Sequence, residues 1–386
     1  MEGYVPACRH PVAAESAADT SRAPPTSLCK RPSEAPPCDT IPSPMTTQTT
    51  PTSPTPRPIR IADNNLWPFP LATGGTLLVD AGWEPDADPA AWPAIEAQLT
   101  SLGLALRDIR VVVVTHEHID HAGLAARWAA VGARIVAAHA AVPALTAGLE
   151  GLRAQRLARA AELARHGAPS EVTATLLGAR TAQQRWEPCP IEDITPAEDA
   201  PTYPLADGRT LRLRLAPGHT PGNLVATIQA PDDAEGLDLC SGDTLLPTTI
   251  PTPGLHFPHA LAGDTSRWPS LPPFLRSVAA LRALPITRIL PGHGDVVAAP
   301  LRLFAQFEDH HARRGARVRA ALEAAGAATA FEVARAVFPR LPHARIAQAM
   351  TETIGHLDVL AEAGVARAET TDDLAHVVWH HVSGTA

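Results

Sequence analysis

The distribution of apolar residues along the chain indicates a layered protein that alternates strands and helices. The run Ile109–Val114 combines an isoleucine with four valines, which is typical of a strand buried on both faces of a sheet. Apolar residues recur at helical spacing in the segments that flank this run. The remaining apolar or alternating runs predict strands at 59–61, 76–82, 133–139, 210–215, 223–228, 237–241 and 286–290, and helices at 88–102, 122–130 and within 266–284.

A cluster of polar side chains directly follows the central strand. Residues 115–121 read Thr-His-Glu-His-Ile-Asp-His. Imidazole and carboxylate groups are good ligands for zinc and similar divalent ions. His116 and His118 can reach one ion together, and Asp120 and His121 can face a second ion beside it. A histidine-rich surface turn is the simpler alternative, whereas a helical zincin motif is excluded because its histidines are four residues apart.

Three later candidate ligands also stand just after predicted strands. His219 lies in the turn Gly-His-Thr-Pro-Gly, Asp243 in Ser-Gly-Asp-Thr, and His293 in Pro-Gly-His-Gly. A metal centre at one edge of a pair of sheets needs ligands that are delivered in this way. His139 also ends a predicted strand, but a single histidine in that position is more often structural, so we leave it outside the ligand set.

The pattern His-x-His-x-Asp-His at 116–121 and the three later stations, in this order, resemble the metallo-β-lactamase fold hydrolases. The resemblance runs from about residue 57 to residue 299. It implies an α/β fold, a four-layer αββα sandwich, with two divalent metal ions at its active site. In this family an aspartate in the position of Asp80, which closes the predicted strand at 76–82, orients a metal-binding histidine; an ordinary turn aspartate is the alternative.

The resemblance and the expected geometry together assign the ligands to two metal ions. Such a pair lowers the pKa of a shared water from 15.7 toward about 7 and provides a hydroxide for attack on a carbonyl or phosphorus centre. Asp120 is also the candidate catalytic residue, because it can pass a proton. Zinc is the first choice, and iron or manganese fit the same ligands. The first ion is assigned to His116, His118 and His219, the second to Asp120, His121 and His293, with Asp243 as the bridge.

The ligand set narrows the substrate class. A bridging aspartate is usually lacking in the true β-lactamases, so the chain is more similar to the glyoxalase II, lactonase and ribonuclease branches. We expect a small-molecule acyl substrate, namely a thioester, ester or lactone. A metal-dependent endoribonuclease is the alternative enzyme, although a net charge of −8 argues against a protein that mainly binds phosphates. A non-catalytic metal-binding protein is the alternative from another class.

The N-terminal segment 1–56 is rich in proline, serine and threonine and has no apolar periodicity, which predicts disorder. It contains no hydrophobic stretch of the kind found in secretory signals, and we find no run of eighteen apolar residues anywhere in the chain. None of the five cysteines has CxxC spacing, so a disulfide framework and a zinc ribbon are both disfavoured. These features predict a cytoplasmic protein without membrane contact.

Two further segments lie outside the predicted sandwich. The mostly helical range 142–185 stands between the second and third metal stations, where an insertion in this fold usually covers the active site; a scaffold helix pair is the alternative. In 300–386, three predicted helices and a strand pair resemble the winged-helix domain of the lactamase-beta-2-like branch. Nine arginines there face ten acidic residues, so we expect packing or homodimerisation rather than DNA reading. His310 and His311 are predicted to be helix-surface residues.

Overall fold

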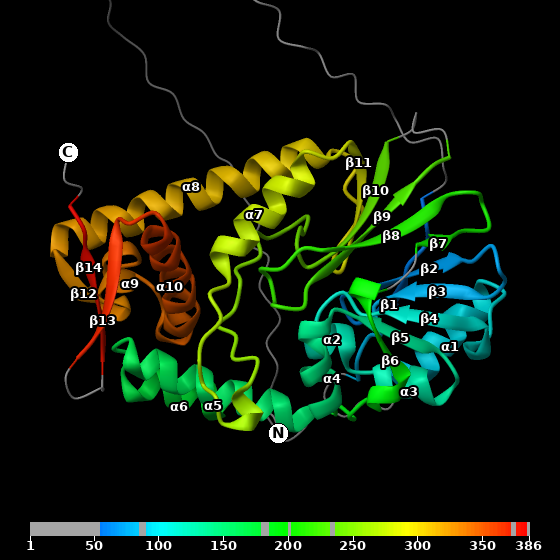
Figure 1. The fold of residues 1–386 in the computed structure, drawn as a ribbon, viewed down its shortest axis with the longest axis horizontal. Coiled ribbons are helices and arrows are strands. Elements are labelled where there is room, and N and C mark those ends of the chain that lie inside the picture. The colour runs from blue at the N-terminus through cyan, green and yellow to red at the C-terminus, as the bar shows by residue number, and fades with distance from the viewer. Residues whose placement is uncertain are drawn as a thin grey trace, which may run out of the picture. The chain divides into compact units, whose positions relative to one another are not determined.

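The computed structural model describes residues 55–84, 90–178, 185–199, 202–231, 236–371 and 376–383. Nearly all of the predicted disordered tail therefore lies outside the described residues. Within the described ranges the strands form three sheets, two larger ones and a small one (Figure 1). None of the described helices is long and apolar enough to cross a membrane.

The first sheet is mixed, with the predicted central strand β4 in its interior. β4 (Ile109–Val113) runs parallel to both neighbours, β3 (Thr76–Val79) and β5 (Arg134–Ala137), so its backbone is hydrogen-bonded on both sides. The two N-terminal strands add to this sheet in antiparallel fashion. In order across the sheet, the described strands are β1 (Ile59–Ile61), β2 (Asn64–Pro70), β3 (Thr76–Val79), β4 (Ile109–Val113), β5 (Arg134–Ala137) and β6 (Ile194–Pro196).

The second sheet is also mixed, because the two strands that come last in the chain run parallel to each other and the other neighbouring pairs are antiparallel. β9 (Leu224–Gln229) shows the period-two pattern of a strand between two layers: Leu224, Ala226 and Ile228 face the first sheet, whereas Val225 faces the opposite side. In order across the sheet, the described strands are β11 (Ile286–Pro291), β10 (Leu237–Gly242), β9 (Leu224–Gln229), β8 (Thr210–Leu215) and β7 (Tyr203–Pro204).

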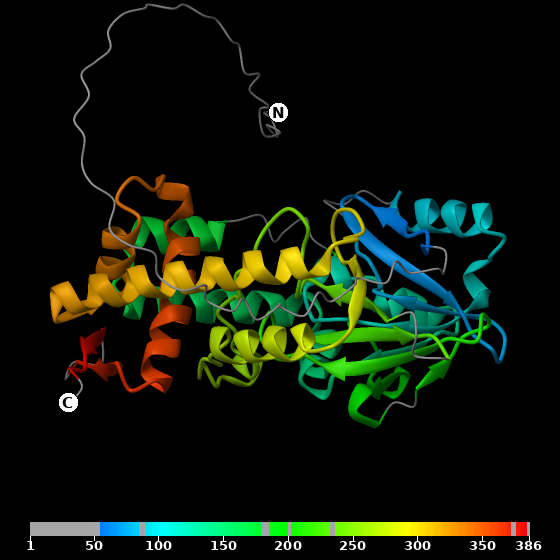
Figure 2. The ribbon, with the colours of Figure 1, turned by 90° about the horizontal axis from the view of Figure 1, so that it is seen from above.

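The two sheets pack face to face, with helices on their outer sides (Figures 1 and 2). Trp67, Phe69 and Val113 of the first sheet meet Leu211 and Cys240 of the second in one buried cluster. Such burial of apolar side chains is the main stabilising term of the fold. The outer helices are α1 (Ala91–Ser101), α2 (Ile119–Ala122) and α3 (Ala125–Ala130) on the first sheet, and α7 (Leu271–Arg282) and the start of α8 (Pro300–Ala325) on the second.

The predicted insertion between the metal stations is helical, as expected. Its helices are α4 (Val142–Ala147), α5 (Leu149–Arg165) and α6 (Ser170–Gly178), and the range 179–184 lies outside the described residues. Ala158 and Leu163 of α5 and Val172 of α6 are buried against the C-terminal part of the chain. The insertion is therefore held on one side by the C-terminal helices. Short 3-10 helices are η2 (Leu106–Asp108), η3 (His139–Ala141), η4 (Ile191–Asp193), η5 (Ala197–Asp199), η6 (Ala260–Ala262) and η7 (His343–Arg345).

The C-terminal region combines three helices with a small antiparallel sheet of strand order β12-β14-β13. The long helix α8 reaches from the second sheet to this region (Figure 2). Thr329 begins the next helix with a capping box, since its hydroxyl accepts from Glu332 N–H and the Glu332 carboxylate accepts from Thr329 N–H. The elements are α8, β12 (Ala327–Thr329), α9 (Ala330–Val337), α10 (Ile346–Glu362), β13 (Ala366–Thr370) and β14 (Val377–His381).

The prediction that His311 lies on a helix surface is wrong. Its side chain is 5% exposed, and its ring packs against the rings of Phe307 and His356. The apolar stripe of α8 that includes Phe304 and Phe307 also contains position 311, which is four residues further along the same helical face. His310, by contrast, retains 29% of its side-chain exposure, beside Glu352.

Candidate metal centre

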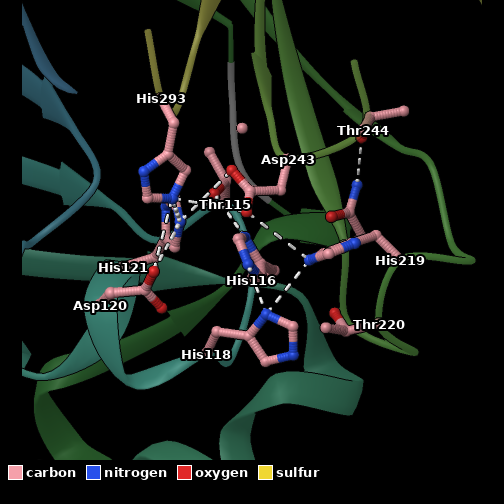
Figure 3. A network of polar contacts seen from close by, with 12 residues as sticks. Thr115, His116, His118, Asp120, His121, His219, Thr220, Asp243, Thr244 and His293 are labelled. Atoms are coloured by element: carbon pink, nitrogen blue, oxygen red, sulfur yellow. Dashed lines mark hydrogen bonds and ion pairs between the residues drawn. The ribbon is translucent and has the colours of Figure 1, made fainter. Parts of the chain in front are cut away.

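The predicted ligands converge at one edge of the sheet pair, as Figure 3 shows. His116 and His118 follow β4, and Asp120 and His121 lie in the short helix α2 that comes next. His219 follows β8, while Asp243 follows β10 and His293 follows β11. The arrangement expected from the sequence, with ligands at strand ends, is present. The predicted ligands form three groups in which the potential ligand atoms lie within 4.8 Å of one another: His116, His118 and His219; His116, His121 and Asp243; Asp120, His121 and His293.

Asp80 holds two of these histidines in position through hydrogen bonds. His121 donates from Nδ1 to Asp80 Oδ2 at 2.9 Å. The Thr115 hydroxyl donates to Asp80 Oδ1 at 2.7 Å and accepts from His116 Nδ1 at 3.0 Å. Because both imidazoles donate from Nδ1, each directs its Nε2 into the centre. Asp80 thus lies where the family resemblance places the orienting aspartate.

The backbone of Asp80 adopts a left-handed conformation with φ of 72°. This conformation is uncommon for a residue other than glycine, and asparagine and aspartate adopt it most readily. The Asp80 N–H donates to Val113 O at 2.7 Å, and Asp80 Oδ1 also accepts from Thr115 N–H at 2.9 Å. The surrounding hydrogen bonds therefore hold a strained residue in place below the ligands.

The first group consists of three imidazole nitrogens. His118 Nδ1 lies 3.0 Å from His116 Nε2 and 3.1 Å from His219 Nε2. His116 and His219 are buried and His118 is partly exposed, and the buried Nδ1 of His219 has no hydrogen-bond partner in the described structure. Burial, reinforced by His219, lowers the pKa of His118 to about 3, and burial also lowers the pKa of His116 and His219. The three imidazoles are therefore neutral, the form in which histidine binds metal.

The second group combines histidines with carboxylates. His121 Nε2 lies 3.2 Å from His293 Nε2, and Asp120 Oδ2 lies 3.4 Å from His293 Nε2. Asp243 stands between the two groups, because its Oδ2 is 3.8 Å from His219 Nε2 and 3.5 Å from His293 Nε2. Its Oδ1 is 3.4 Å from His121 Nε2. Asp243 is therefore placed between both groups, as a bridging ligand must be.

The electrostatics of the second group differ from those of the first. Burial alone would lower the pKa of His121, but Asp243, Asp80 and Asp120 raise it well above its ordinary value. Burial alone would raise the pKa of Asp243, but the positive charge on His121 lowers it to about 2. The carboxylates thus stay ionised and draw a positive charge into the site. A divalent cation supplies such a charge.

The residues present fit a divalent metal centre. The contacts of 3.0–3.1 Å from His118 Nδ1 to His116 Nε2 and His219 Nε2 cannot both be hydrogen bonds, because His116 carries its proton on Nδ1 and the single Nδ1 of a neutral His118 either donates one proton or accepts one. For Zn–N bonds of 2.0–2.1 Å, tetrahedral ligands stand about 3.3 Å apart, which is close to the observed spacing. A Cβ at Gly292 would lie only 2.7 Å from both Asp243 Oδ1 and His121 Cε1, so a glycine is needed beside the ligands.

Two residues at the site were not predicted from the sequence. His256 comes from the loop before η6, donates from Nε2 to His219 O at 2.9 Å, and lies 6.1 Å from the His118 ring in a stacked arrangement. Glu117, between two ligands, accepts from the Thr220 hydroxyl at 2.7 Å and ties the two ligand loops together. Glu117 was visible within the motif, whereas His256 stands alone in a proline-rich loop and gives no signal in the sequence. His139, left out of the ligand set, is exposed and absent from the three groups.

Comparisons with known proteins agree with this geometry. The model of the metallo-beta-lactamase superfamily matches residues 71–293. The chain is 28% identical over 319 residues to the probable metallo-hydrolase YqjP of Bacillus subtilis strain 168, and the match covers 82% of this chain and 93% of that protein.

Two crystal structures are similar in fold. The metallo-beta-lactamase family protein TTHA1429 of Thermus thermophilus aligns with a TM-score of 0.63 and 26% identity, over 86% of this chain and 98% of that one. A beta-lactamase domain protein from Burkholderia ambifaria aligns with a TM-score of 0.60 and 23% identity, over 85% and 91% of the two chains. With its paired mixed sheets and its converging histidines and aspartates, the chain belongs to the metallo-beta-lactamase superfamily and is a metal-dependent hydrolase.

Proposed function

We propose that this hydrolase uses two divalent metal ions, zinc first, to cleave a thioester, ester or lactone. The observation that supports two ions is the position of Asp243 between two separate ligand groups. His116, His118 and His219 would hold one ion, and Asp120, His121 and His293 the other. Bound divalent ions supply Lewis acidity toward the substrate oxygen and lower the pKa of water.

The chain itself positions this chemistry. Asp80 holds His121 directly and His116 through Thr115, so the direction of both Nε2 atoms is set before a metal arrives. Asp120, predicted to be catalytic, has 30% of its side chain exposed, against 12% for Asp243 and 2% for Asp80. It is therefore the carboxylate of the three that water or substrate reaches most easily.

The cavity beside the centre supports an acyl substrate rather than RNA. Its walls are mainly apolar, and Arg159 is the only arginine that lines it among the described residues. The arginine-rich stretch 313–319 of α8 is partly occupied by internal contacts. Arg314 lies 3.3 Å from Glu352, and Arg317 donates to Val337 O. Such side chains are not free to follow a phosphate backbone.

We propose a winged-helix arrangement for the C-terminal region, in which three helices are followed by the strand pair β13–β14. Its contacts support a packing role. Trp379 donates from Nε1 to His166 Nδ1 at 3.3 Å, and His166 O accepts from Phe331 N–H at 3.0 Å. His166 directly follows α5, which lines the cavity on its other side. The C-terminal region therefore supports the wall of the substrate cavity.

The direct test combines metal analysis with turnover. Purified protein is expected to contain about two metals per chain by plasma mass spectrometry and to hydrolyse members of a panel of thioesters, esters and lactones. His118→Ala should lower both metal content and turnover, because it removes the Nδ1 atom that faces His116 and His219 in the first ligand group. His139→Ala is the matched control, since His139 is exposed and outside the ligand groups. A His118→Ala variant with normal metal content and turnover would contradict the proposal, and cleavage of RNA alone would favour a nuclease.

A further inference from the structure

A cavity of about 450 Å³ opens beside the first ligand group. His118 and Glu117 form one end of it, and helices α4 and α5 with the loop around η6 form the walls. The proximity to His118 makes this cavity the place where the remainder of a substrate lies when its reacting group is at the metal centre. Its apolar walls come from Pro143, Leu152, Trp186, Pro221, Phe257 and Leu261.

One positive charge in this wall has no acidic partner among the described residues. Arg159 of α5 donates from Nη2 to Leu255 O at 3.2 Å, and its buried Nε has no partner. The nearest acidic residue on the same helix, Glu162, is engaged by Arg267, Arg165 and His166. Burial, followed by the charge of Arg156, lowers the pKa of Arg159, as expected for a guanidinium that lacks an anion. A desolvated cation without a counter-ion is unfavourable, so this position gains from an anionic ligand.

A second donor stands one helical turn before Arg159. The Oε1 of Gln155 accepts from Phe257 N–H at 3.0 Å, and because a backbone N–H can only donate, this contact fixes the orientation of the amide. The amide nitrogen of Gln155 therefore keeps its two N–H donors, for which the described structure shows no partner. Positions 155 and 159 are four residues apart on α5 and lie on the same face. Both side chains line the cavity.

His256 connects this pair of donors to the metal centre. A Cβ at Gly254 would lie 3.2 Å from His256 Nε2 and 3.3 Å from Arg159 Nη2, so the imidazole and the guanidinium are neighbours. The His256 ring in turn stacks at 6.1 Å on the ring of His118. The His256 side chain thus lies between the guanidinium and the first ligand group.

We propose that Arg159 and Gln155 form a subsite for a carboxylate, and that the enzyme acts on an ester or thioester whose acyl part ends in this carboxylate. The proposal rests on the proposed hydrolysis only for the nature of the reacting group. A guanidinium fork with one neighbouring amide matches the two oxygens of a carboxylate. The apolar walls of the same cavity accommodate the methylene groups of the acyl chain.

The test measures binding, independently of turnover. Zinc-loaded protein is titrated with glutarate and with its uncharged analogue glutaramide by calorimetry. The wild type is expected to bind glutarate more tightly than glutaramide. Arg159→Gln should weaken glutarate binding about tenfold to a hundredfold, because it removes charge-assisted hydrogen bonds. Arg153→Gln is the matched control, since Arg153 is exposed on the same helix and does not line the cavity.

The possible outcomes distinguish a failure of the proposed carboxylate subsite from a failure of the proposed hydrolysis. Equal affinity of the wild type for glutarate and glutaramide overturns the proposal, and this comparison needs no variant. Glutarate binding that survives Arg159→Gln also overturns it, because the acid then binds elsewhere, such as at the metals. If Arg159→Gln does not fold, Arg159→Lys should weaken glutarate binding, since a lysine lacks the fork. Binding that depends on Arg159, without hydrolysis of any acyl panel member, supports the subsite and refutes the proposed hydrolysis.

Discussion

Arg267 joins three parts of the molecule, and its removal should cost much of the stability. The guanidinium donates to both carboxylate oxygens of Asp358 on α10, at 2.6 and 2.8 Å, and from Nε to Glu162 Oε1 on α5 at 3.2 Å. The side chains of Arg267, Asp358 and Glu162 are 14%, 9% and 8% exposed. Arg267→Met keeps the apolar part of the side chain but leaves the buried Asp358 without its cation and removes one of the three partners of Glu162.

Removing one partner of a buried ion pair typically costs 3–5 kcal/mol, and residual solvent contact places the expected loss near about 3 kcal/mol. For a chain of this size, with an unfolding entropy of about 2.1 cal/mol/K per residue, that loss lowers the midpoint of thermal unfolding by roughly 4 °C. The assay is differential scanning calorimetry at pH 7 in the presence of a chelator, so that metal release does not add its own contribution. Arg276→Met is the control, because Arg276 and Glu362 also join α7 to α10 at 2.8 Å but are 64% and 52% exposed.

The exposed pair is expected to contribute at most about 1 kcal/mol. The pH dependence gives a second readout. Burial alone would raise the pKa of Glu162, but the hydrogen bond and charge of His166 and the charge of Arg267 lower it to about 2. The stabilisation from ionised Glu162 is fully present above its unfolded pKa of about 4.5 and is lost as the pH falls toward 2. The difference between the thermal midpoints of the wild type and Arg267→Met should therefore shrink as the pH falls below about 4. Equal losses from Arg267→Met and Arg276→Met would refute this reasoning.

Two further substitutions test the support of the ligands. Asp80→Asn keeps a residue that tolerates the left-handed backbone but removes the charge that orients His121, so zinc affinity should fall about tenfold to a hundredfold in competition with a chromophoric chelator. Asp295→Asn, at a carboxylate 89% exposed, is its control, and unchanged affinity in Asp80→Asn would contradict the assigned role. Gly218→Ala should destabilise the chain by at least about 2 kcal/mol in urea unfolding, because its φ is 147° and its Cβ would collide with the backbone of Phe274. Gly103→Ala shares the positive φ without any atom within 4 Å, and an equal loss there would show that the collision is unimportant.

The parts of the fold that local pattern controls were predicted well. β4 and β9 were recognisable because apolar runs and period-two alternation report directly which faces of a strand are buried. The helices of the insertion and of the tail followed from helical spacing, although their ends differ by several residues from the predicted ranges. The error at His311 arose because a histidine was read as polar, although its position belongs to the apolar stripe of α8.

The sequence by itself determined which residues can bind metal, because the motif at 116–121 is contiguous and each later ligand directly follows a strand. Only the tertiary structure decided how those ligands are oriented, since the proton on His116 is placed by Asp80 through Thr115. It also decided what surrounds the centre. Arg159 is one of several arginines on an ordinary helix, and it differs from Arg153 only because the chain folds one of them against the cavity and leaves the other in water. Neighbours that are distant in sequence meet only after packing, and no local pattern encodes that encounter.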